Sequence, residues 1–507
     1  MSRLKLPSKT ETILWWSFIV AGILLRLRQY SLNRSFWADE SSLAINLVAR
    51  TFGQLTQPLD YQQGAPIGFL FIEKTCMTLF GNNEFALRLF PLVAGILALY
   101  LLYRISRDHF GMSGLFAVAA FSIGWDLIYY SSELKQYSSD AAIALLLIYL
   151  ALRLFDAETT QARDFILLGI VGVIAIWVSH PSFFILAGIG LALLIEKIIR
   201  RSPMPLGWLF ALGVVWLASF GLQYYVSLRG LAADEYLQYY WGKAFAPMPP
   251  WRNREWYFNT YVSMMGISLS TEQIAIFLAP VLAVIGGVSL FIRKRSLALI
   301  LVLTAFMALV ASALQKYPLK GRFMLFLIPL FLLIIAEGIG RVYKITAKKS
   351  RALALVLSVL PALWLLYFPI AVSYNETRIA QSGAGIRPMV AYISEHRMPD
   401  DIIYVYHSAD PSFVYYAPLF GIDIKDQHIR IGKSPVLKKR ALEKFFQDVD
   451  SLKGNGRVWF IFTDIVDCGG CDGDPQAFFV SELDLRGTLL DQSNGIGANA
   501  YLYDMNR

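Results

Sequence analysis

The sequence has little charge, and it contains neither an internal repeat nor a low-complexity stretch. Only 16% of its 507 residues are charged, whereas 56% are hydrophobic and the mean hydropathy is +0.49. A soluble globular domain carries about 25% charged residues, so this composition disfavours that class and indicates a polytopic membrane protein. The net charge of +9 does not predict nucleic-acid binding, because Lys and Arg gather at the cytoplasmic ends of membrane helices.

Cysteine is also scarce, which limits the metal and redox chemistry of the chain. Cys468 and Cys471 form a Cys-Gly-Gly-Cys stretch, and no second cysteine pair exists to complete a zinc site. Because this stretch is predicted to lie outside the cytoplasm, a disulfide is favoured over a redox motif or half of a zinc site. Cys76 stands alone in an apolar run and is expected only to pack. The first apolar run lacks a small-residue cleavage site, so we expect a retained helix rather than a signal peptide.

Apolar runs that approach membrane-spanning length recur up to residue 372. A spanning helix needs about 20 mostly apolar residues. Eleven runs come near this length, at residues 13–27, 85–103, 114–130, 140–155, 165–178, 183–198, 206–228, 274–292, 297–314, 322–339 and 352–372. The predicted fold is therefore an α-helical polytopic membrane protein with about eleven transmembrane helices. Runs 165–178 and 183–198 are also compatible with one broken, re-entrant element around His180 and Pro181.

Alternate connections between these runs are short and basic. They contain Arg3, Lys5 and Lys9; Arg104 and Arg107; Arg153 and Arg163; Lys197, Arg200 and Arg201; Arg293, Lys294 and Arg295; and Arg341, Lys344, Lys348, Lys349 and Arg351. Positive charge marks the cytoplasmic connections of membrane proteins. The N-terminus is therefore predicted inside and the C-terminus outside.

The outward connections are long and predict folded parts outside the spans. In the outer loop 29–84, residues 41–52 and 65–80 carry apolar residues at helical spacing and predict interfacial helices. The outer loop 229–273 is rich in Tyr, Trp and Pro, which suits an aromatic belt or a loop that faces sugar or lipid. The transmembrane domain is predicted to cover residues 1–373.

Hydropathy falls after this domain, and residues 374–507 are predicted to form an extracytoplasmic α/β domain. Residues 387–396 and 412–419 are expected to be helices. Short apolar runs at residues 401–406, 458–463 and 498–503 are expected to be strands. Helices that alternate with short apolar strands are typical of a small α/β domain.

Four groups of polar residues border the spans on the predicted outer side. They are Asp39 and Glu40; Glu133, Lys135, Tyr137 and Asp140; His180; and Tyr317 and Arg322. Ionisable groups beside membrane spans are costly and usually face a cavity or a partner. If their segment is helical, Glu133, Tyr137 and Asp140 share one face through i, i+4, i+7 spacing.

Each group also has a purely structural interpretation. Ser35 or Asp39 could cap the helix that follows, and Glu133 could lie in a solvated interfacial turn. His180 beside a proline could mark a satisfied kink, and Arg322 could snorkel towards the interface.

Together the four groups would place carboxylates, cations and aromatic rings on one face of the membrane. A carboxylate can take the proton of an attacking hydroxyl or amine, and a guanidinium can neutralise a departing phosphate. This division of roles fits sugar transfer from a lipid phosphate. It also fits a proton-coupled transporter, although transporters usually place their binding groups near the membrane midplane in broken helices.

Four stretches carry a family resemblance. They are residues 37–40 (Trp-Ala-Asp-Glu), 79–89 (Leu-Phe-Gly-Asn-Asn-Glu-Phe-Ala-Leu-Arg-Leu), 132–137 (Ser-Glu-Leu-Lys-Gln-Tyr) and the Arg-led helix within 317–329. In this order they resemble motifs of the membrane-embedded GT-C glycosyltransferases. The superfamily concerned is the one similar to dolichyl-phosphate-mannose–protein mannosyltransferases, which includes the bacterial lipid A aminoarabinose transferases. The resemblance covers roughly residues 14–329.

The resemblance implies an inverting sugar transfer at the extracytoplasmic face of a bacterial inner membrane, from a polyprenyl-phosphate donor to a protein, lipid or polysaccharide. Asp39 would be the catalytic base, with Glu40 beside it. The expected substrate-binding residues are Glu133, Lys135, Tyr137, Asp140, His180, Tyr317 and Arg322, of which Arg322 would hold the donor phosphate. No nucleic acid is expected as a partner. The alternative function is a lipid-linked-sugar flippase or another membrane transporter.

One stretch departs from the family pattern. Relatives often carry Lys-Pro-Pro-Leu or His-Pro-Pro-Leu in the first outer loop, whereas residues 63–67 read Gln-Gly-Ala-Pro-Ile. Only Pro66 is kept, so the aminoarabinose specificity is not carried over to this chain. No cofactor is indicated with certainty, and a divalent metal ion is left open.

Overall fold

The computed structural model describes residues 9–156, 161–200, 204–270, 275–378, 385–432, 441–463 and 474–506. The chain divides into two compact units. The membrane unit comprises Met1–Leu32, Phe52–Pro58 and Gly64–Ile379, and the C-terminal unit comprises Asn33–Thr51, Leu59–Gln63 and Ala380–Arg507. The segment that carries Asp39 therefore packs with the C-terminal residues, although it is far from them in the sequence.

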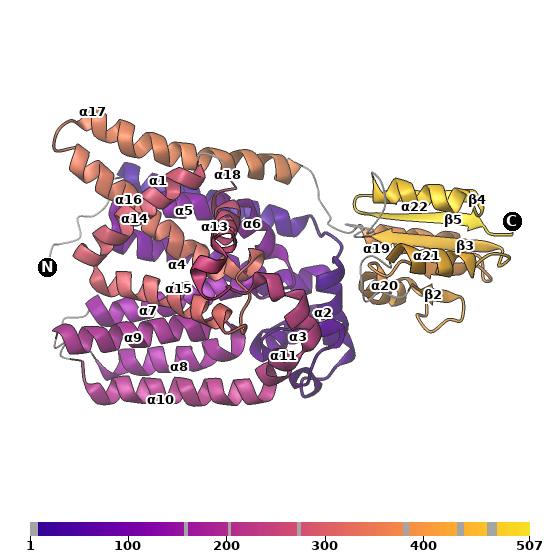
Figure 1. Ribbon diagram of the computed structural model, residues 1–507, viewed down its shortest axis with the longest axis horizontal. Coiled ribbons are helices and arrows are strands. Elements are labelled where there is room, and N and C mark those ends of the chain that lie inside the picture. The colour runs from indigo at the N-terminus through magenta and orange to yellow at the C-terminus, as the bar shows by residue number, and fades with distance from the viewer. Residues whose placement is uncertain are drawn as a thin grey trace. The chain divides into compact units, whose positions relative to one another are not determined.

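The described residues of the membrane unit form helices and the loops that connect them, without a strand (Figure 1). Its helices are α1 (Lys9–Ser31), α3 (Ile67–Phe80), α4 (Glu84–Phe110), α5 (Gly114–Ile123), α6 (Trp125–Tyr129), α7 (Tyr137–Asp156), α8 (Ala162–Val178), α9 (Ser182–Arg200), α10 (Leu206–Gln223), α11 (Arg229–Ala233), α12 (Glu235–Tyr240), α13 (Arg254–Leu269), α14 (Ala275–Arg293), α15 (Arg295–Ala313), α16 (Ile328–Thr346), α17 (Arg351–Ala354) and α18 (Leu360–Arg378). All eleven predicted apolar runs fall on helices.

Nine helical stretches of the described chain are long and apolar enough to cross a membrane. One of them, Glu84–Ile123, has 40 residues and contains both α4 and α5, which pack against each other across the short turn Gly111–Ser113. One crossing needs about 20 residues, so this stretch is long enough for two. Helix α8 has 17 residues and falls just short of the others. One hairpin and one short helix thus account for the difference between nine stretches and eleven predicted runs.

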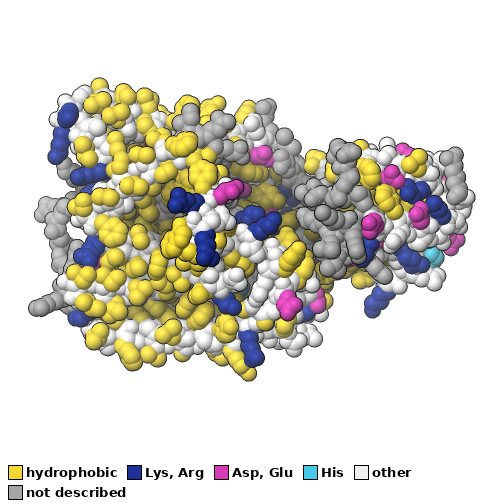
Figure 2. Space-filling model, in the orientation of Figure 1, with side chains coloured by type: hydrophobic (Ala, Val, Ile, Leu, Met, Phe, Trp, Pro, Cys, Tyr) yellow, Lys and Arg dark blue, Asp and Glu magenta, His cyan; other side chains and the backbone are white. Residues whose placement is uncertain are grey.

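Close backbone approach holds some of these helices together. A Cβ atom at Gly286 of α14 would lie 1.9 Å from the carbonyl oxygen of Ile334, and one at Gly338 of α16 would lie 2.0 Å from that of Leu282. Small residues at such crossings are typical of membrane helices, which pack by van der Waals contact rather than by the hydrophobic effect. Hydrophobic side chains cover much of the visible face of the membrane unit (Figure 2), as expected of a surface that meets lipid.

The C-terminal unit is built on a five-stranded mixed sheet with the strand order β2-β1-β3-β5-β4. Its strands are β1 (Ile402–Val405), β2 (Ile429–Ile431), β3 (Arg457–Thr463), β4 (Thr488–Gly495) and β5 (Ala498–Asp504). Strands β2, β1 and β3 are parallel, whereas β5 is antiparallel to both β3 and β4. Its helices are α2 (Ala38–Ala49), α19 (Ile386–His396), α20 (Asp410–Tyr416), α21 (Ala441–Asp450) and α22 (Pro475–Asp484).

Alternating side chains give this sheet two buried faces. Phe460 of β3 belongs to a core that includes Phe445 of α21 and Phe479 of α22. The next residue back, Trp459, points to the other face and meets Tyr392 of α19 edge-on at 6.0 Å. Successive residues of a strand point to opposite faces, so both faces of the sheet carry helices.

The elements predicted for this part of the chain are present, and four others were not foreseen. The helices near residues 387–396 and 412–419 and the strands near 401–406, 458–463 and 498–503 all occur. Strands β2 and β4 were not predicted because neither is a continuous apolar run, and much of β4 is exposed. Helices α21 and α22 were not predicted either. Cys468 and Cys471 lie outside the described residues.

Candidate functional site

Residues 131–136 form a turn directly before α7. This turn is buried although it carries charged side chains. Glu133 and Lys135 are only 1% and 5% exposed, so the interpretation as a solvated turn is wrong. The backbone of Glu133 is extended, with φ −122° and ψ 142°. The helical face predicted for Glu133, Tyr137 and Asp140 therefore applies only to Tyr137 and Asp140, which both lie in the first turn of α7.

A cation is held against aromatic rings next to this turn. The guanidinium carbon of Arg322 lies 5.4 Å from the ring centroid of Tyr137, which is cation–π distance. Tyr130 belongs to the same cluster: burial and the nearby Glu133 raise the pKa of its phenol, while Arg322 opposes this shift. The structure thus brings residues of two distant segments, 130–137 and 322, into one group.

Tyr317 and the connection between α8 and α9 join this group. The Tyr317 hydroxyl donates to the carbonyl of Phe323 (3.0 Å). Burial, together with the nearby Asp140 and Tyr137, raises the pKa of Tyr317 well above its usual value. The side chains of Asp140 and Ser179 are also neighbours. Three segments that lie far apart in the sequence therefore meet in the membrane unit.

His180 lies beside Ser179 in the connection between α8 and α9. Two separate helices flank it, so residues 165–198 are not one continuous element. The Nε2 atom of His180 is buried and makes no hydrogen bond to the described part of the chain. Burial lowers the pKa of His180 to about 4, because the charged imidazolium loses its hydration. The ring is therefore neutral near pH 7.

The outer loop between α10 and α13 contributes a further residue to this group. The amide of Leu319 donates to the carbonyl of Ala244 (2.9 Å), which joins this loop to the segment before Arg322. The ring of Trp241 meets Phe323 edge-on at 4.9 Å and 84°, and Phe323 meets Tyr137 at 5.7 Å. From the sequence, this loop is recognisable only as rich in aromatic residues. No local pattern shows that Trp241 packs against Phe323, the residue after Arg322.

Asp39 and Glu40 lie in the first turn of α2, within the C-terminal unit. The N-cap of α2 is Trp37, whose own side chain makes no capping hydrogen bond. Neither Ser35 nor Asp39 therefore occupies the N-cap position that the structural interpretation gave them. Asp39 is partly exposed, whereas Glu40 is fully buried. Carboxylates near a helix N-terminus are stabilised in their charged form by the helix dipole.

The C-terminal unit anchors the entry to α2. The amide of Phe36 donates to the hydroxyl of Tyr416 in α20 (2.8 Å), and the rings of Phe36 and Tyr415 are 5.2 Å apart. Phe36 is completely buried. The chain is therefore held in place directly before the two acidic residues, which limits the movement of Asp39.

A second contact ties α2 to residues 59–63 of the same unit. The side chain of Asn46 accepts from the amide of Asp60 (2.9 Å) and donates to its carbonyl (3.2 Å), and Arg50 pairs with Asp60 at 2.9 Å. Tyr61 and Gln62 follow with φ angles of 58° and 49°. Two adjacent non-glycine residues in the left-handed region are strained and are typical of functional or tightly held turns.

The nine predicted site residues thus fall into two groups. Asp39 and Glu40 belong to the C-terminal unit, and the other seven belong to the membrane unit. Within the described ranges, no group of three or more His, Cys, Asp or Glu side chains is placed to hold a metal ion.

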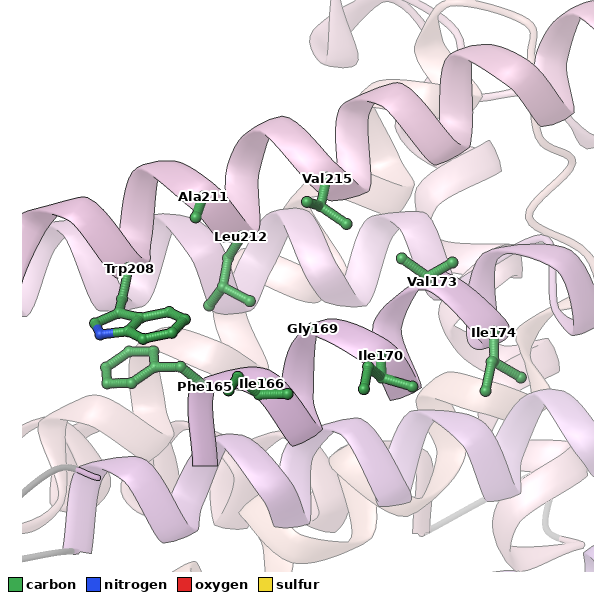
Figure 3. A pocket seen from close by; sticks show the side chains of 10 residues that line it. All are labelled: Phe165, Ile166, Gly169, Ile170, Val173, Ile174, Trp208, Ala211, Leu212 and Val215. Atoms are coloured by element: carbon green, nitrogen blue, oxygen red, sulfur yellow. The ribbon is translucent and has the colours of Figure 1, made fainter. Parts of the chain in front are cut away.

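An apolar groove lies between α8 and α10 (Figure 3). It has a volume of about 340 Å³ and runs from Phe165 and Trp208 at one end to Ile174 and Val215 at the other. The rings of Phe165 and Trp208 are stacked at 5.8 Å. The residues that line it carry no acid or base, so this groove suits hydrocarbon and not chemistry.

Helix α3 carries a carboxyl group that sequence reasoning did not single out. Glu73 is completely buried, and neither of its oxygens forms a hydrogen bond within the described residues. Burial raises the pKa of Glu73 well above its usual value, because an unpaired carboxylate is strongly disfavoured away from water. Glu73 is therefore expected to be protonated in the folded protein at neutral pH.

Glu73→Gln should stabilise the protein, and the gain should grow with pH. Unfolded Glu73 loses its proton near pH 4.3, whereas the folded state keeps it, so the free energy of unfolding falls as the pH rises above that value. The loss is complete once the pH exceeds the pKa of the folded state. Glutamine cannot ionise and removes this loss, so the gain should be small at pH 5 and larger at pH 8.

Apparent unfolding midpoints of the detergent-solubilised protein at pH 5 and pH 8 would measure this effect. Glu395→Gln serves as the control, because Glu395 is exposed on α19 and should show no pH-dependent gain. If Glu73→Gln follows the wild type at both pH values, Glu73 is not a neutral buried acid.

The described residues form a many-helix membrane unit and a small unit with a mixed sheet. Residues 64–222 match the family model described as dolichyl-phosphate-mannose-protein mannosyltransferase. No curated protein matches the sequence.

Two solved structures share the fold over nearly the whole chain. ArnT from Cupriavidus metallidurans bound to undecaprenyl phosphate matches with a TM-score of 0.56 and 12% identity, covering 98% of both chains. The apo state of the same protein matches with a TM-score of 0.53 and 13% identity, covering 96% of this chain and 97% of that one. The predicted resemblance to the GT-C superfamily is confirmed by the family match and by this fold.

Proposed function

We propose that the protein is a membrane glycosyltransferase that takes its sugar from a polyprenyl-phosphate donor. The observation that carries the proposal is the partly buried group around Arg322, in which a guanidinium lies over the ring of Tyr137 beside Glu133 and Tyr130. A guanidinium suits the oxygens of a lipid phosphate. The similar fold of a protein bound to undecaprenyl phosphate supports this donor class.

The proposed reaction is a single displacement with inversion. The acceptor oxygen attacks the anomeric carbon and forms the new glycosidic bond, while the bond from that carbon to the phosphate oxygen breaks. The proton of the acceptor hydroxyl passes to the Asp39 carboxylate. The negative charge that develops on the polyprenyl phosphate is stabilised by Arg322, with Lys135 as a second cation.

The remaining predicted residues take supporting roles in the proposal. Glu40 supports Asp39 in the first turn of α2, whereas Tyr137, Asp140, His180 and Tyr317 shape the donor site. The alternating basic connections support an inner-membrane protein whose active face is on the extracytoplasmic side.

Deletion of the gene in its native host tests the function. Envelope glycans analysed by mass spectrometry should lose one sugar substituent, and the purified protein should bind undecaprenyl phosphate. Unchanged envelope glycans together with no lipid binding would contradict the proposal. A protein that moves lipid-linked sugar across vesicle membranes, without ever releasing free polyprenyl phosphate, would be the flippase of the alternative interpretation.

A further inference from the structure

Helix α12 presents a cluster of exposed aromatic side chains. Tyr236, Tyr239 and Tyr240 are 57%, 79% and 61% exposed, and the rings of Tyr236 and Tyr240 are stacked at 6.1 Å. We call these three side chains the tyrosine face. A contiguous set of large exposed rings on a helix of six residues indicates a surface that has a partner.

Ring contacts connect the tyrosine face to the partly buried group around Arg322. Tyr240 meets Trp241 edge-on at 5.0 Å, and Trp241 meets Phe323 at 4.9 Å. Phe323 in turn meets Tyr137, the ring over which the Arg322 guanidinium lies. The face is therefore continuous with the site proposed for the donor phosphate, and it extends from that site to the surface of the membrane unit.

Polar side chains accompany these rings. Glu235 and Gln238 are exposed on the same helix, and Glu235 lies one turn from both Gln238 and Tyr239, at i, i+3 and i, i+4 spacing. Asp234 caps the helix by accepting from the amide of Leu237 (2.9 Å). Helices that bind a membrane interface are rich in Lys and Arg on their polar side, whereas α12 has only acidic and neutral polar residues.

Aromatic rings combined with carboxylate and amide groups match the two surfaces of a sugar. The C–H groups on the face of a pyranose carry partial positive charge and pack on the negative face of an aromatic ring. The hydroxyl groups at its rim need hydrogen-bond acceptors such as Glu235 and the Gln238 amide. An apolar lipid surface would use the rings alone.

We propose that the tyrosine face, with Glu235 and Gln238, is an acceptor subsite that binds a pyranose ring of a glycan. The inference rests on the proposed function and specifies its acceptor class as carbohydrate. One sugar of the acceptor stacks on the face while the hydroxyl of its neighbour attacks the donor. The new bond therefore joins a sugar to a sugar.

Leucine and phenylalanine variants separate sugar stacking from membrane anchoring. Leucine keeps the apolar bulk that anchoring needs but has no flat ring, whereas phenylalanine keeps the ring. In the native host lacking the gene, complementation with Tyr236→Leu/Tyr239→Leu should reduce the modified envelope glycan by about tenfold relative to wild type. The matching double phenylalanine variant should restore it.

Two further measurements complete the experiment. Both purified double variants should bind undecaprenyl phosphate as the wild type does, because neither residue touches the proposed phosphate site. Tyr367→Leu serves as the matched control, since Tyr367 is 60% exposed on α18 and should leave the glycan unchanged.

Several outcomes would overturn the subsite. These are wild-type glycan levels in the double leucine variant, equal loss in the leucine and phenylalanine variants, loss of lipid binding in the leucine variant, and a transferred sugar found on protein or on a lipid amine. Failure of the proposed function is distinguishable, because the wild-type protein itself would then neither bind undecaprenyl phosphate nor alter the envelope.

Discussion

Asp39→Asn should lower the turnover number by about 10²–10⁴-fold, because an amide cannot accept the proton that the acceptor hydroxyl loses during attack. The substitution hardly changes the size of the side chain. Asp39 is not the N-cap of α2, and its replacement removes a charge from the first helical turn, a cost of about 0.3–1 kcal/mol. Folding and donor binding should therefore persist while transfer collapses.

Release of polyprenyl phosphate by the purified variant, measured beside its unfolding midpoint, would show this separation. Glu40→Gln is the control, because Glu40 is adjacent but completely buried and is expected to lose less activity. Full turnover in purified Asp39→Asn protein would remove Asp39 from the mechanism without affecting the fold.

The helices of the membrane unit could be predicted because hydropathy acts along the chain. A spanning helix satisfies its own backbone hydrogen bonds and meets lipid on much of its surface, so its apolar run is visible in the sequence. The number of predicted spans differs from the number of long apolar helical stretches at two places. At α4 and α5 a hairpin joins two runs, and α8 is short. A hydropathy profile shows the length and the polarity of an apolar run, but it does not show where the chain turns back between two helices.

The sheet of the C-terminal unit was predictable only where its strands are buried. Strand β3 has one partly buried residue followed by six buried ones and therefore reads as an apolar run. Strand β4 lies at the edge of the sheet with mostly exposed residues, and it is held by backbone pairing to β5. Backbone hydrogen bonds do not depend on side-chain identity, so such a strand leaves little trace in the sequence.

The candidate site, too, could be predicted only where a local sequence pattern marks its residues. Costly polar residues beside the spans pointed to Glu133, Asp140 and Arg322, because burial of charge needs a reason. Trp241 joins their group through a backbone hydrogen bond between Leu319 and Ala244, a long-range contact that residue spacing does not encode. The grouping of α2 with the C-terminal unit is equally a matter of tertiary packing.

Arg322→Ala should weaken the binding of undecaprenyl phosphate to the purified protein by about 10- to 100-fold. Hydrogen bonds to a charged group contribute about 1.5–3 kcal/mol, and each 1.4 kcal/mol is about tenfold in the dissociation constant. Arg322→Lys should restore binding only in part, because an ammonium group lacks the planar fork that matches two phosphate oxygens. Lys135→Ala should have a smaller effect than Arg322→Ala.

Lys320→Ala provides the matched control for charge alone. Lys320 lies two residues before Arg322 and is exposed, so it contributes a similar charge without the aromatic surroundings. If simple attraction to an anionic lipid explains binding, Lys320→Ala and Arg322→Ala should weaken it equally. If the ring of Tyr137 orients Arg322 towards the phosphate, only Arg322→Ala should do so, and Tyr137→Leu should reproduce part of the loss. Unchanged lipid affinity in Arg322→Ala would instead leave Arg322 as a residue that snorkels towards the interface.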